Sequence, residues 1–162
     1  MGRAFIFGDG INTDVLAPGS LMKLPPEELA QHCLEAIDPQ FAKEVRPGDF
    51  VFAGRNFGQG SSREQAVVSL KLLGVSAVLA TSFARIFYRN AMNLGLPAVK
   101  FDAVAEIKKG NEIDIDLVTG SLANRDTGKT YAIKPLPSHL MEMVEAGGLI
   151  PYLDQRLNAR AF

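Results

Sequence analysis

The sequence has a single cysteine, no tryptophan and only two histidines among its 162 residues. The one cysteine, Cys33, cannot form an internal disulfide. It also excludes an iron–sulfur cluster or a cysteine-based zinc site held by this chain alone, because each needs several thiolates. The sequence lacks an excess of either charge as well, with 17 basic and 18 acidic residues. A chain without surplus positive charge binds a phosphate backbone poorly, so we expect no nucleic-acid partner.

Long apolar segments are absent too. No apolar run in the sequence approaches the ~20 residues that span a bilayer, and residues 1–7 lack the long apolar stretch of a signal peptide. The two histidines, His32 and His139, stand in expected helices without a metal-ligating side chain four residues further on, so we expect no metal site. These absences predict a cytoplasmic protein in a reducing compartment, without a membrane partner.

Short apolar runs alternate with amphipathic segments along the chain. A length of 162 residues suits one domain covering residues 1–162. The runs predicted to be strands are 4–7, 50–53, 75–80, 113–118 and 131–136. The segments predicted to be helices are 25–39, 61–73, 82–93 and 138–146. Because α/β units precede a small antiparallel part, the predicted fold class is a mixed α/β domain with β layers and a helical layer.

The most informative segment is residues 54–66 (GRNFGQGSSREQA), which follows a predicted strand and opens a predicted helix. Its glycines let backbone N–H groups approach a ligand closely, and a helix N-terminus adds unpaired N–H donors with a partial positive charge. Arg63 adds a guanidinium that binds a carboxylate through two hydrogen bonds. The segment therefore predicts a site for an anion such as a carboxylate. A structural alternative stays open, because Ser61 and Glu64 match a capping box.

Known phosphate-binding and nucleophile signatures do not fit this loop. A Walker loop needs a lysine, and the loop has none. The third glycine of a dinucleotide fingerprint and the final glycine of a hydrolase elbow are also missing. A serine without a histidine near it in sequence is a poor base, unless N–H groups and an arginine stabilise its alkoxide while a strong electrophile acts on the substrate. The sequence contains no obvious electrophile of that kind.

Four segments resemble those of one family. Residues 60–64 (GSSRE) resemble the active-site loop of the swivelling domain of the aconitase superfamily. Residues 8–14 (GDGINTD), 50–66 and 82–97 (SFARIFYRNAMNLGLP) are similar, in this order, to segments of the separate small subunits of the isopropylmalate dehydratase family. The resemblance spans roughly residues 5–100.

This resemblance implies a three-layer β/β/α swivelling domain that docks on a separate large subunit, as a heterodimer or heterotetramer. In the family, the large subunit holds a 4Fe–4S cluster whose open iron is a Lewis acid, so the partner would supply the missing electrophile. The implied reaction of this hydro-lyase removes water from 2-isopropylmalate and adds it back to give 3-isopropylmalate, a step of leucine biosynthesis. The substrate is a small hydroxy diacid.

The resemblance also implies roles for single residues. Ser61 matches the catalytic base, which removes a proton next to a carboxylate. The residues that match substrate-binding positions are Ser62, Arg63 and Asp14. The residues expected to support the loop are Gly58, Gly60 and Glu64. Asp14 also fits a simple turn or cap, with Asn12 beside it.

Three residues after the first proline–glycine turn depart from the family pattern and bear on the substrate. Leu21 and Met22 offer apolar contact to an alkyl group such as isopropyl, whereas Lys23 would suit a third carboxylate. A methylene or two in a pocket decides only ~1–3 kcal/mol, so homoaconitate-, dimethylmalate- and citramalate-type substrates stay open, as does a dicarboxylate-binding module without catalysis. Arg85 and Arg89, four residues apart on one predicted helix, fit the site, a subunit interface or a solvated face.

Overall fold

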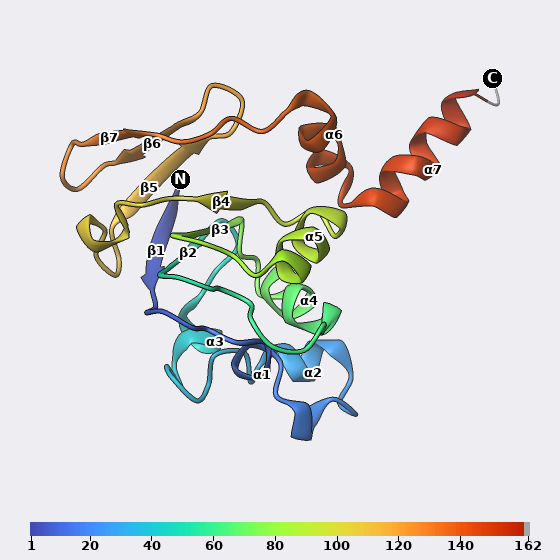
Figure 1. The fold of residues 1–162 in the computed structure, drawn as a ribbon, viewed down its shortest axis with the longest axis horizontal. Helices are drawn as coiled ribbons and strands as arrows, with labels where there is room; N and C mark the ends of the chain where they lie inside the picture. Colours follow the sequence, from blue (N-terminus) through green and yellow to red (C-terminus); the bar gives the residue numbers. More distant parts are fainter. Residues whose placement is uncertain (161–162) are drawn as a thin grey trace.

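The structure, a computed structural model, describes residues 1–160 and is built on one seven-stranded sheet (Figure 1). The strands lie in the order β4-β3-β2-β1-β5-β6-β7. Their bounds are β1 (Gly2–Ile6), β2 (Phe50–Ala53), β3 (Ala77–Ala80), β4 (Ala98–Lys100), β5 (Glu112–Asp116), β6 (Ser121–Asn124) and β7 (Thr130–Ala132). β1 to β4 are parallel, whereas β5 pairs antiparallel with β1 and continues into the antiparallel strands β6 and β7.

Alternate side chains of β2 show why the parallel strands are covered on both faces. Val51 and Ala53 belong to a cluster of buried residues on the helical side, while Phe50 and Phe52 belong to a second cluster that includes residues of the antiparallel strands. The ring of Phe101 lies 5.8 Å from that of Phe52 and 5.4 Å from a tyrosine ring of β7. The antiparallel part therefore packs on the parallel part, and the expected β/β/α layering is confirmed.

Helices cover the other face of the parallel strands (Figure 1). Their bounds are α1 (Thr13–Leu16), α2 (Pro26–Ala30), α3 (Phe41–Glu44), α4 (Glu64–Leu72) and α5 (Arg85–Asn93). The predicted apolar stripe of Ala66, Leu70 and Leu73 is buried, as the helical period requires of an inward face. Gly74 follows this helix with a φ of +90°, the left-handed conformation that commonly ends a helix.

The helix predicted over residues 25–39 is shorter than expected. α2 ends at Ala30, and turns follow it. The backbone reverses at Leu34, whose φ is +60° and whose N–H donates to the carbonyl of Val15 at 3.0 Å. The Ile37 side chain is half exposed, and the predicted helix is wrong beyond Ala30.

Other boundaries and elements also differ from the prediction. α4 begins at Glu64 and α5 at Arg85, each three residues later than predicted. β7 ends at Ala132, opposite Ser121 where its partner strand β6 begins, and Pro135 has no N–H with which to extend a ladder to residue 136. Among the strands and α-helices of the described residues, β4, β6, α1, α3 and α7 have no predicted counterpart.

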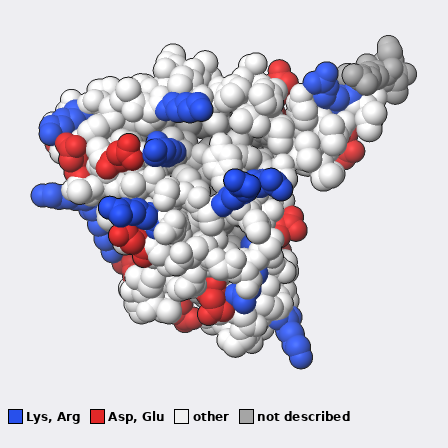
Figure 2. All heavy atoms as spheres, in the orientation of Figure 1, with Lys and Arg blue, Asp and Glu red and all other residues white. Residues whose placement is uncertain are grey.

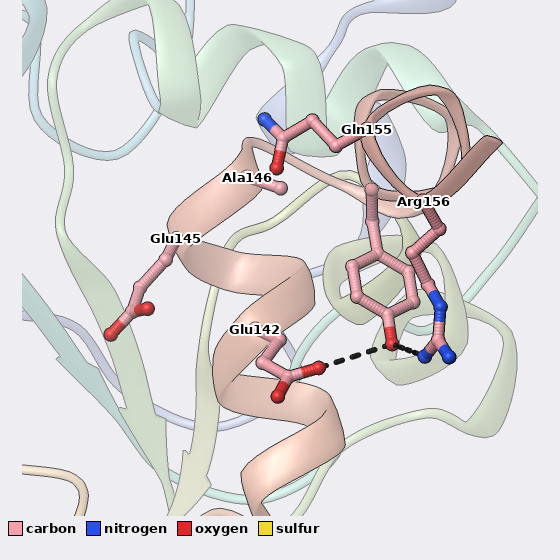
Figure 3. A pocket seen from close by; sticks show the side chains of 6 residues that line it. Glu142, Glu145, Ala146, Gln155 and Arg156 are labelled. Carbon is pink, nitrogen blue, oxygen red and sulfur yellow. Dashed lines mark hydrogen bonds between the residues drawn. The ribbon is translucent and has the colours of Figure 1, made fainter. Parts of the chain in front are cut away.

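The last two helices form a corner beside the sheet. α6 (Ser138–Ala146) matches the prediction and ends at Gly147, whose φ is +94°. α7 (Leu149–Arg160) projects away from the other layers (Figure 1). Figure 3 shows the corner, where the Tyr152 hydroxyl donates to Glu142 at 3.1 Å and Arg156 donates to the Tyr152 oxygen at 2.6 Å. None of the helices within residues 1–160 combines the length and the apolar composition of a membrane span.

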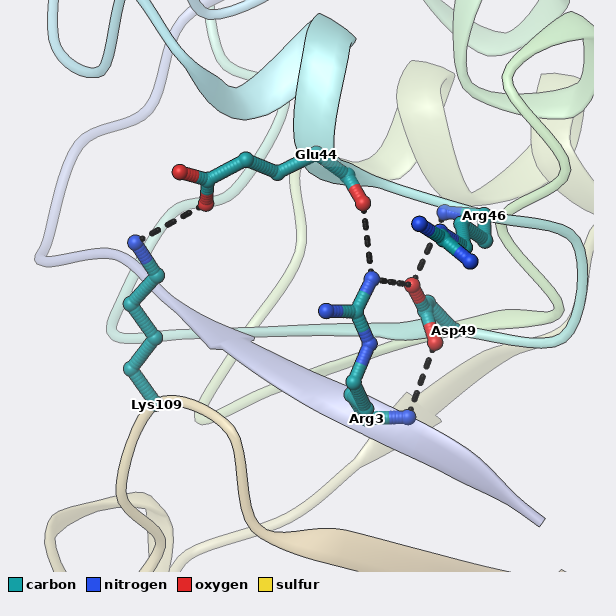
Figure 4. Close-up of polar contacts among 5 residues, drawn as sticks. All are labelled: Arg3, Glu44, Arg46, Asp49 and Lys109. Carbon is teal, nitrogen blue, oxygen red and sulfur yellow. Dashed lines mark hydrogen bonds and ion pairs between the residues drawn. The ribbon is translucent and has the colours of Figure 1, made fainter.

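A buried carboxylate holds the start of the parallel sheet together. Asp49 is 4% exposed and accepts three hydrogen bonds, which come from the backbone N–H of Arg3 at 2.9 Å, the guanidinium of Arg3 at 3.0 Å and the backbone N–H of Arg46 at 2.8 Å (Figure 4). Arg3 also donates to the carbonyl of Glu44 at 2.7 Å. These bonds connect β1 with the segment that enters β2, and thereby fix the parallel pairing that positions the loops beyond it.

Candidate active site

The loops that follow β1, β2 and β3 meet at the carboxyl ends of these strands. The Gly58 N–H donates to the carbonyl of Ile11 at 2.7 Å, and the Thr13 N–H donates to the carbonyl of Gln59 at 2.8 Å. The N–H of Phe57 donates to a carbonyl of the third loop, at residue 82, with a length of 3.0 Å. Backbone bonds thus join three segments that are far apart in the sequence. Ligands of open α/β sheets bind at such strand ends.

Two glycines of the central loop have conformations that other residues adopt poorly. Gly58 has a φ of +84°, and a Cβ atom on it would lie 2.2 Å from Cγ of Phe87. Gly60 has a φ of +108° and faces the Thr13 hydroxyl, which would lie 3.1 Å from an added Cβ. The glycines therefore let the loop pass over the Phe87 ring and approach α1 closely.

A pocket of about 370 Å³ lies between the first two loops. The residues that line it are Asn12, Thr13, Asp14, Gln59, Gly60, Ser61 and Arg63. Four of them were singled out from the sequence as site residues. One of the four, Asp14, lies 46 or more positions before the other three in the sequence. Ser61 is exposed at this pocket, so its hydroxyl is accessible to a small molecule. The structure thus brings Asp14, Gly60, Ser61 and Arg63 together.

An ion pair orders the cationic side of the pocket. Nη1 of Arg63 donates to Oδ1 of Asp14 at 2.9 Å and to the carbonyl of Ala17 at 3.1 Å. The same Asp14 oxygen accepts from the N–H of Gly19 at 2.8 Å. The Gly19 amide and then the Arg63 guanidinium hold the pKa of the Asp14 carboxyl below its ordinary value, because both stabilise the charged form. Asp14 therefore orients Arg63 as well as the turn that follows α1.

The capping box is not formed. The residue that precedes α4 is Arg63, in an extended conformation with φ −111° and ψ 106°, and its side chain makes no capping bond. The Ser61 carbonyl, rather than its hydroxyl, accepts the Arg63 N–H at 2.9 Å. Glu64 occupies the first turn of α4 and is exposed. The structural alternative is therefore wrong, because the helix begins two residues too late for Ser61 to cap it.

Other predicted site residues lie outside this pocket. Ser62 is exposed next to Ser61 but does not line the pocket, and Glu64 lines a neighbouring apolar one. Leu21 and Met22 are partly buried against the helical-side core, and Lys23 is exposed. Arg85 and Arg89 are exposed on α5, also outside the lining residues.

Thr13 and Gln59 were not among the predicted site residues, although they line the pocket. Their roles depend on the backbone bond between them, which joins positions 46 residues apart. Nothing in either local sequence indicates that contact. The available signals were the polarity of the two segments that carry them and the resemblance of both segments to one family.

Cys33 does not provide a ligand for a metal centre at this pocket. Its side chain is fully buried, and burial raises the pKa of its thiol, which disfavours the thiolate that binds metals. Within residues 1–160 there is no group of three or more His, Cys, Asp or Glu side chains arranged to hold a metal ion. His32 instead contacts Glu35 through Nδ1 at 2.7 Å. The residues of this chain therefore do not fit an iron–sulfur cluster.

The layering and the glycine-loop pocket agree with the aconitase-type domain that the sequence motifs resemble. The family described as the aconitase C-terminal domain matches residues 28–104, which contain the loop from Gly58 to Arg63 and the helix after it. This match, which covers slightly less than half of the chain, indicates the class of protein, and the whole-chain relatives decide it.

Comparison of the whole chain narrows the class. The chain is 49% identical to the 3-isopropylmalate dehydratase small subunit of Nautilia profundicola, over 96% of this chain and 95% of that protein. It is 46% identical to the isopropylmalate/citramalate isomerase small subunit of Methanocaldococcus jannaschii, over 96% and 94%. The crystal structure of 3-isopropylmalate dehydratase from M. jannaschii superimposes with a TM-score of 0.92 and 44% identity, over 99% of this chain and 96% of that one. The chain belongs to the family of 3-isopropylmalate dehydratase small subunits.

Proposed function

We propose that this chain is the small subunit of a hydro-lyase that interconverts 2-isopropylmalate and 3-isopropylmalate by dehydration and rehydration, in leucine biosynthesis. Membership of the small-subunit family supports the reaction. The observation that carries the proposal at the level of residues is the pocket in which Ser61, Arg63 and Asp14 converge. A hydroxyl beside a guanidinium at an open pocket suits the abstraction of a proton next to a bound carboxylate.

Each residue has a distinct part in this proposal. Ser61 takes the proton from the carbon next to a substrate carboxylate. Arg63 binds that carboxylate, because one of its terminal nitrogens is engaged by Asp14 while the guanidinium has further donors. Ser62 adds a hydroxyl at the same loop. Gly58 and Gly60 let the loop adopt the shape that places Ser61 at the pocket, with Glu64 in the first helical turn behind it.

The proposal requires a larger partner subunit. A serine hydroxyl is a poor base in water, so the pocket must be closed and an electrophile must act on the substrate. The chain's own residues do not fit a 4Fe–4S cluster, and we assign that cluster to the large subunit; when bound, it would supply the Lewis acid. The name "small subunit" of the relatives supports such a partner.

The loop after α1 bears on the substrate. Leu21 and Met22 lie partly buried against the core, with Lys23 exposed beside them. We infer that Leu21 and Met22 contact the substrate's alkyl group when the partner closes the pocket. Citramalate is the second candidate substrate, because the M. jannaschii relative is named an isopropylmalate/citramalate isomerase small subunit. We further infer that residues 1–162 act as a single domain and that the enzyme is cytoplasmic.

Reconstitution tests the proposed function. The chain is mixed anaerobically with the cluster-bearing large subunit of the same organism and assayed with 2-isopropylmalate, citramalate, dimethylmalate and homoaconitate. We expect turnover of isopropylmalate by the mixture and none by the small subunit alone. Preferential turnover of citramalate would replace the proposed substrate with the second candidate. An assembled complex that turns over none of these acids would overturn the hydro-lyase assignment.

A further inference from the structure

A second cavity lies at the β4 edge of the sheet. It opens between β4, the start of α5, the segment that joins β7 to α6, and the first turn of α6, and it encloses about 330 Å³. It shares no lining residue with the Ser61 pocket. Small-molecule sites occupy roughly 300–1,000 Å³ and are mostly apolar with a few polar groups, so this cavity is of the size that holds a small ligand.

The walls of this cavity are apolar. Phe83 and Tyr88 form one wall, with ring centroids 6.1 Å apart. Val99 of β4, Leu136 of the joining segment and Leu140 of α6 form the others. Tyr88 is 40% exposed, which leaves apolar surface of its ring in contact with water. Covering such a surface with a hydrocarbon group removes apolar area from water, which favours binding.

Two lysines line the same cavity. Lys100 is the last residue of β4, and Lys134 lies in the segment between β7 and α6. Within the described part of the chain, neither ammonium group takes part in an ion pair, whereas Lys109 and Lys129 are each paired with a glutamate. None of the residues lining the cavity is acidic. Figure 2 shows basic side chains over β4 and over the segment between β7 and α6, with uncharged surface beside them.

We propose that this cavity binds a small monocarboxylate with a branched or aromatic hydrocarbon tail. The tail lies against the Phe83 and Tyr88 wall, and the carboxylate meets the ammonium groups of Lys100 and Lys134. The groove between α6 and α7 is of similar volume, about 320 Å³, but two glutamates, Glu142 and Glu145, line it with only one arginine, Arg156. Its lining therefore carries a net negative charge, which disfavours such an anion. Apolar walls and unpaired cations coincide at the β4 edge.

This site is independent of the proposed reaction, because its residues do not belong to the Ser61 pocket. A substrate of the proposed reaction is a hydroxy diacid, for which an apolar cavity is a poor match. The ligand expected here carries one charge and no hydroxyl groups. A protein with no hydro-lyase activity would therefore still bind it, and the two proposals fail separately.

Binding of 4-methylpentanoate tests the site. The full chain labelled with ¹⁵N is titrated and followed by amide chemical shifts, with 4-methylpentanamide as the uncharged counterpart and acetate as the charge without a tail. We expect saturable shifts at Val99 and Leu140, with a dissociation constant on the order of 1 mM, as befits so small a ligand. The amide and acetate should each bind about tenfold more weakly, since each loses one of the two contributions.

Variants separate the cavity from general charge effects. Replacing both lysines, as Lys100→Met with Lys134→Met, should weaken 4-methylpentanoate binding about tenfold. Lys108→Met removes an exposed lysine outside the cavity and should change nothing. Single replacements and a circular-dichroism spectrum guard against a misfolded double variant. The proposal is overturned if no backbone amide of the cavity shifts saturably, or if the shifts centre on Ser61 instead. It is also overturned if 4-methylpentanamide binds the parent chain as tightly as 4-methylpentanoate does, or if the double variant binds 4-methylpentanoate as tightly as the parent chain does.

Discussion

Replacement of Gly58 by alanine tests how the glycine loop is held in place. In the structure an added Cβ would lie 2.2 Å from Cγ and 2.3 Å from Cβ of Phe87, well inside van der Waals contact, so the loop or the ring must move by more than 1 Å. The φ of +84° adds a left-handed penalty of about 1–2 kcal/mol, and overpacking adds about 1–3 kcal/mol. We expect Gly58→Ala to lower the free energy of unfolding by about 2–5 kcal/mol.

Gly110 provides the matched control. Its φ is +87°, and nothing lies within 4 Å of its added Cβ, so Gly110→Ala measures the backbone penalty alone, about 1–2 kcal/mol. Urea unfolding followed by circular dichroism gives both values. If the two variants lose the same stability within the error of extrapolation, then Phe87 does not restrain the loop and this account of the site's architecture is refuted.

Three further predictions concern single side chains. Cys33 should resist a thiol reagent in the native state and react once the chain is unfolded, because its thiol is fully buried with a raised pKa; rapid native labelling would contradict its placement. The Asp14 carboxyl should titrate by NMR below its ordinary pKa and move upward in Arg63→Met. Because the folded pKa is lowered, this stabilisation is present above the ordinary carboxyl pKa and is lost as the pH falls through the folded value. Asp49→Ala should cost about 2–4 kcal/mol in urea unfolding, since three hydrogen bonds are removed; a loss below about 1 kcal/mol would contradict its role.

Local patterns predicted the parts of the fold that depend on local physics. The stripe of Ala66, Leu70 and Leu73 follows the helical period, and the structure buries it. Short apolar strands followed by glycine-rich turns sufficed to predict the α/β units. The starts of α4 and α5 were predicted three residues early, because Ser61 and Ser82 are good helix-capping types that tertiary contacts use otherwise. The Ser82 hydroxyl, for example, accepts a backbone N–H of the glycine loop at 2.9 Å.

The arrangement of the site depends on contacts that no local pattern contains. The Arg63–Asp14 pair joins positions 49 residues apart, and the loop over Phe87 depends on packing between two separate segments. The resemblance of short motifs singled out Asp14, Ser61 and Arg63 as candidate site residues, and the structure brings them to one pocket, but the motifs could not say which side chains orient the others. Thr13 and Gln59 were missed because their contribution runs through the backbone. The apolar cavity beside β4 was missed because its walls come from four elements.

Replacing Ser61 tests the central claim that its hydroxyl is the base. The reconstituted enzyme is compared with Ser61→Ala and with the control Ser76→Ala. Ser76 is an exposed serine that directly precedes β3, at the end of the strand away from the pocket. Assembly is checked by size-exclusion chromatography. We expect Ser61→Ala to assemble normally while kcat falls by about 10²–10⁴-fold, and Ser76→Ala to leave kcat unchanged. A Ser61→Ala enzyme that assembles and turns over at the rate of the parent would show that the Ser61 hydroxyl is not the base.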